Sequence, residues 1–555
     1  MVSKRTRAQK FIFVTGGVVS GSGKGITAAS IGAILKARGL TVNIQKMDPY
    51  FNFDAGTLNP AEHGEVFVTG DGGETDLDLG HYERFLDQEL TRASSVMSGQ
   101  VYSKVFADER DGQYLGKTVQ VIPHITNEYQ RRIIEAANGY DVLICEVGGT
   151  IGDYESLAVI EAIRQFRRRV GHENVLYTHV VFLPYLAASK EVKSKPAQNS
   201  VRDLREVGIQ PDILAVRTDH QVSASVYEKL SMYCDVDKEA IVALPTAKTV
   251  YQVPLRMEEA GIGDYIVRKL SLSPTQPVDL SAWSDLVDVI LSEKPAVTVG
   301  IVAKYLDHED TYMSIVESLK SAAWHHASNV KIVWIDAEKL PKSLKPLESV
   351  DAILVPGGFG ERGVPGKILA AQYARENNVP YLGICLGLQV AVIETARNQL
   401  GLTDANSTEF DVSSKHPVVD IMPDQRGVRL GGTMRLGDYP TDLVAGTLAA
   451  RLYGEEHITE RHRHRYEVNN EYREALEGVG LHISGKSPSG TLVEVVERPD
   501  HPFFIASQYH PEFLSRPMRP HPLFDGFIAA ALQILQPASN QATIGVSTIY
   551  EQGRK

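Results

Sequence analysis

The chain has 555 residues, of which 43% are hydrophobic and 23% charged, and its formal net charge is −12 at pH 7. This length predicts two to four globular domains. The net negative charge excludes a protein that binds nucleic acid through a broad positively charged surface. Only three cysteines occur, far apart, which excludes a disulfide scaffold and favours the reducing cytoplasm. No stretch reaches the roughly 20 apolar residues of a membrane span. We therefore expect a cytoplasmic protein with no membrane partner.

The first predicted element is a phosphate-binding loop between a strand and a helix. Apolar residues over 11–14 predict a buried strand, glycines are dense over 16–25, and small residues over 26–36 predict a helix. Glycines let backbone N–H groups approach an anion, the helix N-terminus adds about half a positive charge, and Lys24 can reach the outer phosphates. Gly25 stands where Ser or Thr would usually bind magnesium. A tight turn without a ligand is the alternative, but a nucleotide triphosphate site is favoured.

Acidic residues follow this loop in two places. Residues 51–80 form a long predicted loop whose second half is acidic and includes Asp78. An acidic run is most often a solvated face, but carboxylates beside a phosphate site are also what magnesium requires. The apolar run over 141–146 predicts a strand that ends in Glu146, where nucleotide-hydrolysing domains often hold Mg²⁺. A second glycine loop over 148–155 then lies at the carboxyl edge of the sheet, where ligands collect.

Further apolar runs complete the first predicted domain. Strands are predicted over 175–182, 213–216 and 241–244, with helical segments between them. This alternation indicates a parallel sheet covered on both faces. The loop over 193–198 carries two lysines and an amide, which are either solvated surface or a clamp for a second phosphate group.

A change of composition marks the boundary between two α/β domains. Proline and serine gather over 271–295, which is typical of a linker. A new alternation then begins, with strands predicted over 297–302, 330–335 and 352–355 and a helix over 312–326. We therefore predict two doubly wound α/β domains, over residues 1–275 and 296–535, joined by a linker over residues 276–295. Residues 536–555 are predicted to form a disordered tail.

A second reactive centre is predicted in the C-terminal domain. Cys385 lies in a Gly-x-Cys-x-Gly turn between an apolar strand and a helix, the arrangement of a nucleophile elbow. The helix N-terminus favours the thiolate, His510 can act as the general base, and Glu512 can orient its ring. The glycine turn over 357–360 can supply an oxyanion hole. A buried core thiol and a surface histidine are the alternative, but three matched pieces in one domain favour a nucleophilic site.

Ten sequence runs spread over about residues 10 to 535 resemble the CTP synthase family. They are FVTGGVVS, HGEVFVT, ETDLDLGHYERF, TVQVIPHIT, LVPGGFGERG, YLGICLGLQ, ANSTEF, GGTMRLG, ERHRHRYEVN and YHPEF. The resemblance implies an N-terminal P-loop-like amidoligase domain that uses ATP and Mg²⁺ to phosphorylate O4 of UTP, so that ammonia can displace the phosphate. It implies a class I glutamine amidotransferase domain that releases ammonia from L-glutamine through a glutamyl thioester. It also implies a homotetramer that GTP activates and CTP inhibits, and it leaves filament formation open.

The resemblance further assigns roles to residues that match the family's motifs. The ATP site would be formed by Gly21, Ser22, Gly23, Lys24, Gly25, Ile26, Lys46 and Asp78. The UTP or CTP site would be formed by Ser20, Asp153, Tyr154, Glu155, Lys193, Ser194, Lys195, Pro196, Ala197, Gln198 and Lys229. The Mg²⁺ ligands would be Asp78 and Glu146, and the ammonia gate His63 and Val66. The triad would be Cys385, His510 and Glu512. The glutamine contacts would be Gly358, Leu386, Gly387, Leu388, Gln389, Glu409 and Arg465.

The sequence departs from the family pattern at a few positions, and two other interpretations stay open. The departures are Gly21, Ser22, Ala55, Gly70, Ala303 and the run Pro245–Val250, where the family has an adenine-binding segment. One alternative is an ATP-dependent amidotransferase that acts on carboxylates of a tetrapyrrole. The other is a regulator that has lost turnover. The runs KSKPAQ and DYE favour a pyrimidine nucleotide through resemblance, and the complete triad favours turnover.

Overall fold

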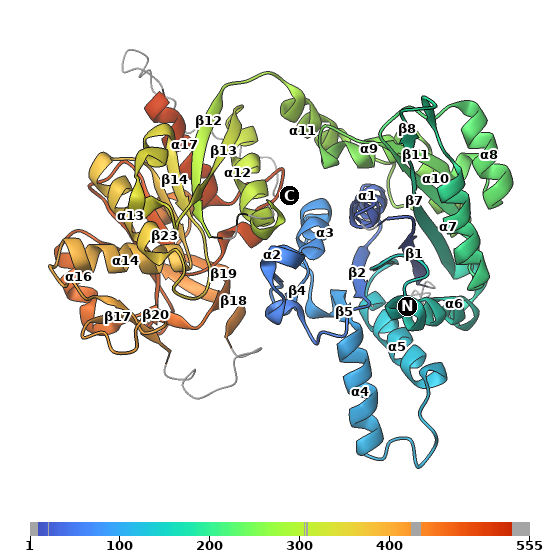
Figure 1. Ribbon diagram of the computed structural model, residues 1–555, viewed down its shortest axis with the longest axis horizontal. Helices are drawn as coiled ribbons and strands as arrows, with labels where there is room; N and C mark the ends of the chain where they lie inside the picture. The colour runs from blue at the N-terminus through green and yellow to red at the C-terminus, as the bar shows by residue number, and fades with distance from the viewer. Residues whose placement is uncertain (1–8, 20, 305, 307–308, 423–433, 536–555) are drawn as a thin grey trace, which may run out of the picture.

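The computed structural model describes residues 9–19, 21–304, 306, 309–422 and 434–535. They form two α/β units that lie side by side, with α11 (Ser281–Leu291) and β12 (Ala296–Ala303) leading from one to the other across the top of Figure 1. The predicted tail over 536–555 lies outside the described residues. Among the residues that are described, no helix combines the length and apolar character needed to cross a membrane.

The N-terminal unit is built on a seven-stranded parallel sheet in the order β11-β10-β7-β1-β6-β2-β5. The bounds are Lys10–Gly16 (β1), Val42–Asp48 (β2), Ser95–Met97 (β5), Val142–Val147 (β6), Val175–Leu183 (β7), Ile213–Thr218 (β10) and Ile241–Pro245 (β11). Nearly every strand residue is buried, because helices cover both faces. The predicted strands are confirmed, with ends that extend beyond the apolar runs.

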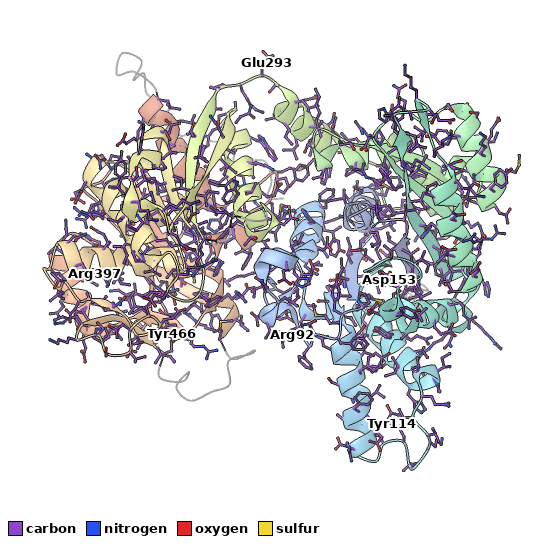
Figure 2. The ribbon with its side chains drawn as sticks, in the orientation of Figure 1. Arg92, Tyr114, Asp153, Glu293, Arg397 and Tyr466 are labelled. Carbon is purple, nitrogen blue, oxygen red and sulfur yellow. The ribbon has the colours of Figure 1, made fainter. Side chains whose placement is uncertain are left out.

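The helices of this unit pack through apolar stripes. Their bounds are Lys24–Lys36 (α1), Pro60–His63 (α2), Asp78–Leu86 (α3), Ser98–Arg110 (α4), Thr126–Ala137 (α5), Leu157–Val170 (α6), Lys195–Glu206 (α7), Ala224–Cys234 (α8), Val253–Glu259 (α9) and Ile262–Lys269 (α10). On α6, for example, the buried Phe166 meets Phe11 and Phe13 of β1 edge-on, with ring centroids 4.8 and 5.7 Å apart. Helices α4 and α5 extend below the sheet as an arm, with Tyr114 near its tip (Figures 1 and 2).

The C-terminal unit has a nine-stranded sheet in the order β13-β12-β14-β15-β23-β22-β21-β18-β19. Its first five strands are parallel and its last four pairings are antiparallel. The bounds are Asn329–Asp336 (β13), Ala352–Val355 (β14), Tyr381–Ile384 (β15), Arg435–Leu443 (β18), His457–His464 (β19), His482–Lys486 (β21), Val493–Glu497 (β22) and Phe504–Ser507 (β23). The helices are Met313–His325 (α12), Val364–Asn377 (α13), Leu386–Asn398 (α14), Leu448–Tyr453 (α15), Arg473–Gly478 (α16) and Pro522–Leu535 (α17).

Two predicted irregular segments contain regular structure. The segment over 51–80 holds α2 and a small hairpin of β3 (Phe67–Val68) and β4 (Glu74–Thr75) before α3 begins. The segment over 276–295 contains α11, because Leu286 and Val287 are buried against the core of the first unit. In both segments the order comes from contacts with distant parts of the chain, which local composition does not reveal.

The two units meet along a face that combines ion pairs and apolar packing. Glu65 accepts a hydrogen bond from the Ser314 backbone N–H at 2.8 Å, and Arg463 Nε donates to Glu74 at 2.9 Å. The Tyr251 hydroxyl donates to Glu317 at 2.7 Å. Figure 1 shows α2, α3 and the β3–β4 hairpin facing β18, β19 and α12 across this boundary. The segment after β2 therefore belongs to the interface between the two units.

Candidate active sites

Cys385 occupies a strained turn between β15 and α14. Its backbone has φ 53° and ψ −102°, a conformation rare for a residue with a side chain. A Cβ on Gly383 would lie 2.7 Å from the Gly387 backbone, and a Cβ on Gly387 would lie 2.2 Å from the Val355 carbonyl oxygen. Both glycines of the motif are therefore required by close backbone approach. The turn places Cys385 at the N-terminus of α14, as the elbow motif predicts.

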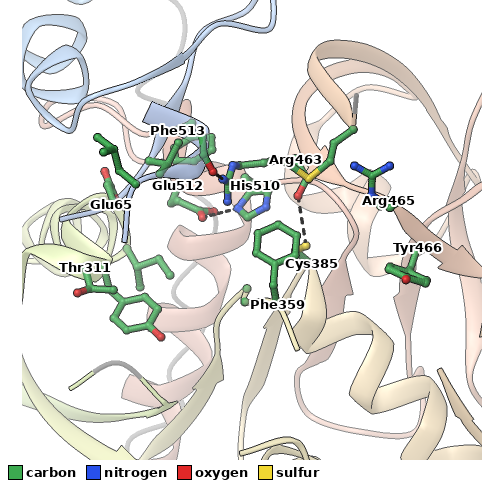
Figure 3. A pocket seen from close by; sticks show the side chains of 18 of the residues that line it. Glu65, Thr311, Phe359, Cys385, Arg463, Arg465, Tyr466, His510, Glu512 and Phe513 are labelled. Carbon is green, nitrogen blue, oxygen red and sulfur yellow. Dashed lines mark hydrogen bonds and ion pairs between the residues drawn. The ribbon is translucent and has the colours of Figure 1, made fainter. Parts of the chain in front are cut away.

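His510 lies between Glu512 and Cys385 (Figure 3). Its Nδ1 is 2.7 Å from Glu512 Oε1, and its backbone N–H donates to the Arg461 carbonyl at 2.8 Å. Within the described residues, His510 Nε2 has no hydrogen-bond partner. Burial lowers the pKa of His510, but the negative charges of Glu512 and Cys385 outweigh it and raise that pKa to about 10. The arrangement can hold an imidazolium beside a thiolate.

The predicted oxyanion turn is fixed by two lysines. Lys367 is fully buried, and its Nζ donates to the Pro356 carbonyl at 2.8 Å. Lys304 donates to the carbonyls of Phe359 and, at 2.9 Å, of Gly360. Burial lowers the pKa of Lys367 to about 7 and that of Lys304 to about 8. Sequence reasoning missed Lys367, because a lysine in a helix is ordinarily interpreted as surface.

A cavity of about 440 Å³ runs from Cys385 to the N-terminal unit. Its lining includes Val66 and six of the C-terminal residues predicted from the sequence to form the triad or contact glutamine, four of which are Cys385, Gly358, Glu409 and Arg465. His510 and Glu512 also line it. His63 and the run over 386–389 are not among its lining residues; His63 is exposed and its ring lies 5.8 Å from that of Tyr50. Residues from both units therefore enclose one space.

Several cavity residues were not predicted. Arg463 on β19 lines the cavity, lies over the Phe359 ring at 5.1 Å and pairs with Glu74 of the N-terminal unit. Arg461, two residues earlier on the same strand, pairs with Glu83. The strand period of two could have indicated that these arginines share one face, but their partners are hundreds of residues away. The run ERHRHRYEVN was recognised as a motif, but the sequence did not show which residues its arginines contact.

The phosphate loop lies where three segments of the N-terminal unit converge. A Cβ on Gly17 would lie 1.9 Å from Ser200 Oγ of α7 and 3.1 Å from Ile151 in the loop after β6. Gly23 has φ 88°, a left-handed conformation that favours glycine. Lys24 Nζ donates to the Gly149 carbonyl at 2.7 Å. Ser20 lies outside the described residues.

Carboxylates and ammonium groups share the floor of this site. Lys46 Nζ contacts Asp78 directly and lies 3.0 Å from Glu146 Oε2. Asp78 and Glu146, the two predicted Mg²⁺ ligands, therefore lie together. Desolvation would raise the pKa of Asp78, but the Lys46 ammonium outweighs it and the pKa is lowered. A Cβ on Gly25 would lie 2.6 Å from Asp78 Oδ1, so a side chain at position 25 would displace that carboxylate.

This donor set fits a magnesium ion. Four carboxylates surround two ammonium groups, namely Asp48, Asp76, Asp78 and Glu146 around Lys24 and Lys46. Asp48 Oδ2 is buried and has no hydrogen-bond partner in the described part of the chain. An excess of carboxylate oxygens, one of them buried without a hydrogen-bond partner, is the environment that a hard divalent cation requires.

The described residues predicted to contact UTP or CTP lie on segments that follow β6, β7 and, for Lys229 on α8, β10. Asp153 accepts a hydrogen bond from the Thr150 N–H at 2.6 Å, while Tyr154 is 88% exposed. Lys193 pairs with Glu191, and the charge of Lys229 also acts on Glu191. Within the run over 194–198, Gln198 Nε2 donates to Ser194 Oγ at 3.1 Å. The structure thus groups the two lysines, and it leaves Tyr154 open to a ligand or a second chain.

The run Pro245–Val250, which departs from the family's adenine-binding segment, begins beside two arginines. Arg217 donates to the Leu244 carbonyl at 2.7 Å, and Arg256 donates to the Pro245 carbonyl at 3.0 Å. Gly70, another departure, approaches Asp438 of the C-terminal unit so closely that a Cβ would lie 2.4 Å from Asp438 Oδ2. The glycine at position 70 is therefore explained by the contact between the units.

Fold and sites together define a class of protein: an α/β domain with a predicted phosphate loop, fused to a class I glutamine amidotransferase. Comparison with family models agrees, since "CTP synthase N-terminus" matches residues 10–272 and "Glutamine amidotransferase class-I" matches residues 308–530. The CTP synthases of Carboxydothermus hydrogenoformans, Thermomicrobium roseum and Methanocaldococcus jannaschii are 57%, 56% and 55% identical to this chain. They cover 94%, 95% and 95% of it and 99%, 96% and 99% of their own lengths. The chain belongs to the CTP synthase family.

A solved structure is also similar in sequence. The glutaminase domain of Trypanosoma brucei CTPS with bound acivicin is 44% identical. The match covers 43% of this chain and 94% of that chain, with a TM-score of 0.41.

Proposed function

We infer that the chain, as a member of this family, is a glutamine-hydrolysing ligase that aminates UTP to CTP. We propose that it does so with two sites: a glutaminase centre at Cys385 and a phosphate-transfer centre around Lys24. The observation that carries this proposal is the cavity of about 440 Å³, which is lined both by Cys385 and by Val66 of the N-terminal unit. A space shared by the two units is what the passage of ammonia from one unit to the other requires.

At the glutaminase centre, the Cys385 thiolate attacks the side-chain amide carbon of L-glutamine. The negative charge that develops on the amide oxygen is stabilised by N–H groups of the turn at Gly358 and of the start of α14. His510 donates its proton to the leaving ammonia and then removes one from the water that hydrolyses the thioester. Glu409 and Arg465, on the cavity wall, have charges suited to the amino and carboxylate groups of glutamine.

At the synthetase centre, the glycine loop donates backbone N–H groups to the phosphates of ATP, and Lys24 and Lys46 offset their charge. Asp78 and Glu146 would hold Mg²⁺, which when bound neutralises charge on the transferring phosphate. Ammonia then replaces the phosphorylated O4 of the pyrimidine. UTP, and CTP as feedback inhibitor, would contact the segments at Asp153–Glu155 and Lys193–Gln198 and the side chain of Lys229.

We further propose that His63 and Val66 control the passage of ammonia, that GTP activates the glutaminase, and that the chain works in the cytoplasm as a homotetramer. Support for self-association comes from large apolar side chains exposed on the arm of α4 and α5. Phe106 is 59% exposed and Leu115 is 88% exposed. Such side chains are typical of surfaces that another chain covers.

The experiment measures CTP formed from UTP, ATP and Mg²⁺, in parallel with glutamine plus GTP and with free ammonia. We expect CTP in both series. CTP from ammonia alone would contradict the glutaminase centre or the route between the sites. Hydrolysis of glutamine without CTP from either source would favour a different amidation substrate, such as a tetrapyrrole carboxylate. Absence of both activities would favour a regulator without turnover.

A further inference from the structure

Two histidines and an aspartate converge where the C-terminal end of α12 meets the first turn of α17, and none of them lines the cavity at Cys385. His325 and His326 end α12, and Asp525 lies in the first turn of α17. His325 Nδ1 is 2.6 Å and His326 Nε2 is 3.0 Å from Asp525 Oδ1. One donor atom from each residue lies within 4.8 Å of the other two, which no other such group in the described ranges achieves. The cluster takes no part in the two sites above.

Adjacent residues of a helix ordinarily point about 100° apart. Here α12 ends at His325, and His326 at its C-cap has φ −90° and ψ 20°. Both rings nevertheless reach the same carboxylate, that of Asp525. Their centroids lie 5.2 Å apart. Helices α12 and α17 are held together beneath the cluster by buried side chains such as Leu319 and Phe524. Core packing therefore fixes the two helix ends that carry the three side chains.

The donor set is that of a transition-metal site. Two imidazole nitrogens and one carboxylate oxygen suit Zn²⁺ and related divalent ions. Ligand atoms about 2.0–2.2 Å from a tetrahedral Zn²⁺ lie roughly 3.3 Å apart, so the observed 2.6 and 3.0 Å need only a small expansion. The His325 side chain is 51% exposed, which leaves room for water as a fourth ligand. The C-terminal end of α12 also favours positive charge.

We propose that His325, His326 and Asp525 form a binding site for a divalent transition-metal ion of the Zn²⁺ class. The ion would replace the ring protons that now face Asp525 and would join α12 to α17. Helix α12 also carries Ser314 and Glu317, which contact the N-terminal unit. A bound ion would therefore stabilise the helix that supports the boundary between the units.

An ordinary histidine–aspartate pair on the same unit provides a matched control. His457 Nδ1 lies 2.8 Å from Asp442 Oδ1 on the surface. Among the described residues, no third histidine, cysteine or acid completes a metal-binding group with this pair. The proposal requires that His457→Ala behaves like the parent chain. It also requires that His326→Ala, which removes one ligand, loses the ion, and that Asp525→Asn, which keeps the size of the side chain but removes its charge, binds the ion more weakly.

The test is calorimetric titration of the chelator-treated full chain with Zn²⁺ in saturating Mg²⁺, repeated with Co²⁺ and followed by visible absorption. We expect the parent and His457→Ala to bind one more equivalent of Zn²⁺ than His326→Ala, and Asp525→Asn to bind it at least about tenfold more weakly. Zn²⁺ should raise the Tm of the parent more than that of either site variant. Equal stoichiometry and affinity in all four proteins would overturn the proposal. Ammonia-dependent CTP synthesis at the parent rate shows that a variant is folded. If His326→Ala does not reach this rate, the proposal is tested by Asp525→Asn alone.

Discussion

Single residues around Cys385 act through the backbone as much as through their own chemistry. The turn that presents the sulfur needs Gly383 and Gly387 because a Cβ at either position would enter neighbouring backbone. The Pro356 carbonyl beside the oxyanion turn is fixed by the buried Lys367. We therefore regard Lys367 as a positioning residue, since it contacts the turn and lines no part of the cavity.

Lys367→Met tests this role. Methionine has a similar length but no donor, so the Pro356 carbonyl loses its partner and the turn loses a fixed position. We expect glutamine hydrolysis to fall roughly tenfold, less than the 10²–10³-fold effect of removing an oxyanion donor itself. Ammonia-dependent CTP synthesis should stay within twofold of the parent, roughly the limit of ordinary scatter. Equal loss of both activities would show that Lys367 supports the fold in general.

Glu146→Ala tests the synthetase centre in the same way. The change removes one predicted Mg²⁺ ligand and leaves Lys46 with fewer carboxylate partners. We expect CTP synthesis from glutamine and from ammonia to be lost together, while glutamine hydrolysis persists. CTP synthesis at the parent rate in this variant would refute the metal assignment; hydrolysis assayed in the same samples provides the folding control.

For single residues, the sequence was informative where the motif is formed by neighbouring residues. Cys385 with its flanking glycines, and His510 with Glu512, are short patterns whose geometry follows from neighbouring residues. The contact of Lys367 with Pro356 depends on how a helix packs on the loop before it, and the close approach of Gly25 to Asp78 joins segments that are distant in the chain. No periodicity or spacing encodes such contacts, so they could not be predicted.

Among the elements, α3 connects the two centres most directly. It begins at Asp78, and its Tyr82 hydroxyl contacts Glu146. At the next residue, Glu83 Oε2 accepts hydrogen bonds from Arg461 at 2.9 Å and from Arg516 at 2.7 Å. The Arg461 carbonyl in turn accepts the N–H of His510. One helix therefore contacts a predicted metal ligand and the strand that supports the catalytic histidine.

Glu83→Gln tests the contribution of this helix. The change removes the charge between two buried guanidinium groups, which keep only longer ion pairs with Glu89, Asp438 and Asp87. Breaking a buried ion pair costs up to about 3–5 kcal/mol. We expect unfolding at a lower temperature and a larger fall in glutamine-dependent than in ammonia-dependent CTP synthesis. Asp87→Asn is the control, because Asp87 is 63% exposed and a surface ion pair is worth about 0–1 kcal/mol. Equal unfolding temperatures in the two variants would contradict this account.

The regular elements were predictable to different degrees. Most of the buried parallel strands were recognised because continuous apolar runs are their signature, but the three-residue edge strand β5 was not. The antiparallel strands β18 and β19 were not, because they carry histidines, arginines and other polar groups that are buried against one another. Helix α11 was interpreted as linker because its apolar stripe is short and lies between proline-rich segments.

For the whole molecule, the boundary between the units contains an acid that titrates near neutrality. Burial raises the pKa of Glu65 to about 7, although Arg84 and the bonds from Ser314 lower it. The folded pKa lies above the ordinary value of 4.5. The protonated carboxyl therefore contributes stability that is present below about pH 4.5 and is lost as the pH rises through about 7.

Glu65→Gln should remove this dependence. We expect the variant to gain on the order of 3 kcal/mol over the parent at about pH 8, since one pKa unit corresponds to 1.36 kcal/mol. The gain should vanish below about pH 4.5. The measurement is the urea midpoint of the first unfolding transition across this range, because a two-unit protein need not unfold in one step. A constant difference between the two proteins at every pH would contradict the assignment to Glu65.

The central claim is that ammonia released at Cys385 is used at a separate centre in the other unit. Its most direct test is the Cys385→Ala variant, assayed for CTP with glutamine plus GTP and with free ammonia. The account predicts that the glutamine-dependent reaction is abolished, because no other nucleophile replaces the sulfur, while the ammonia-dependent rate stays near that of the parent. Loss of both reactions in a folded variant, or CTP formed from glutamine without Cys385, would contradict the two-site account.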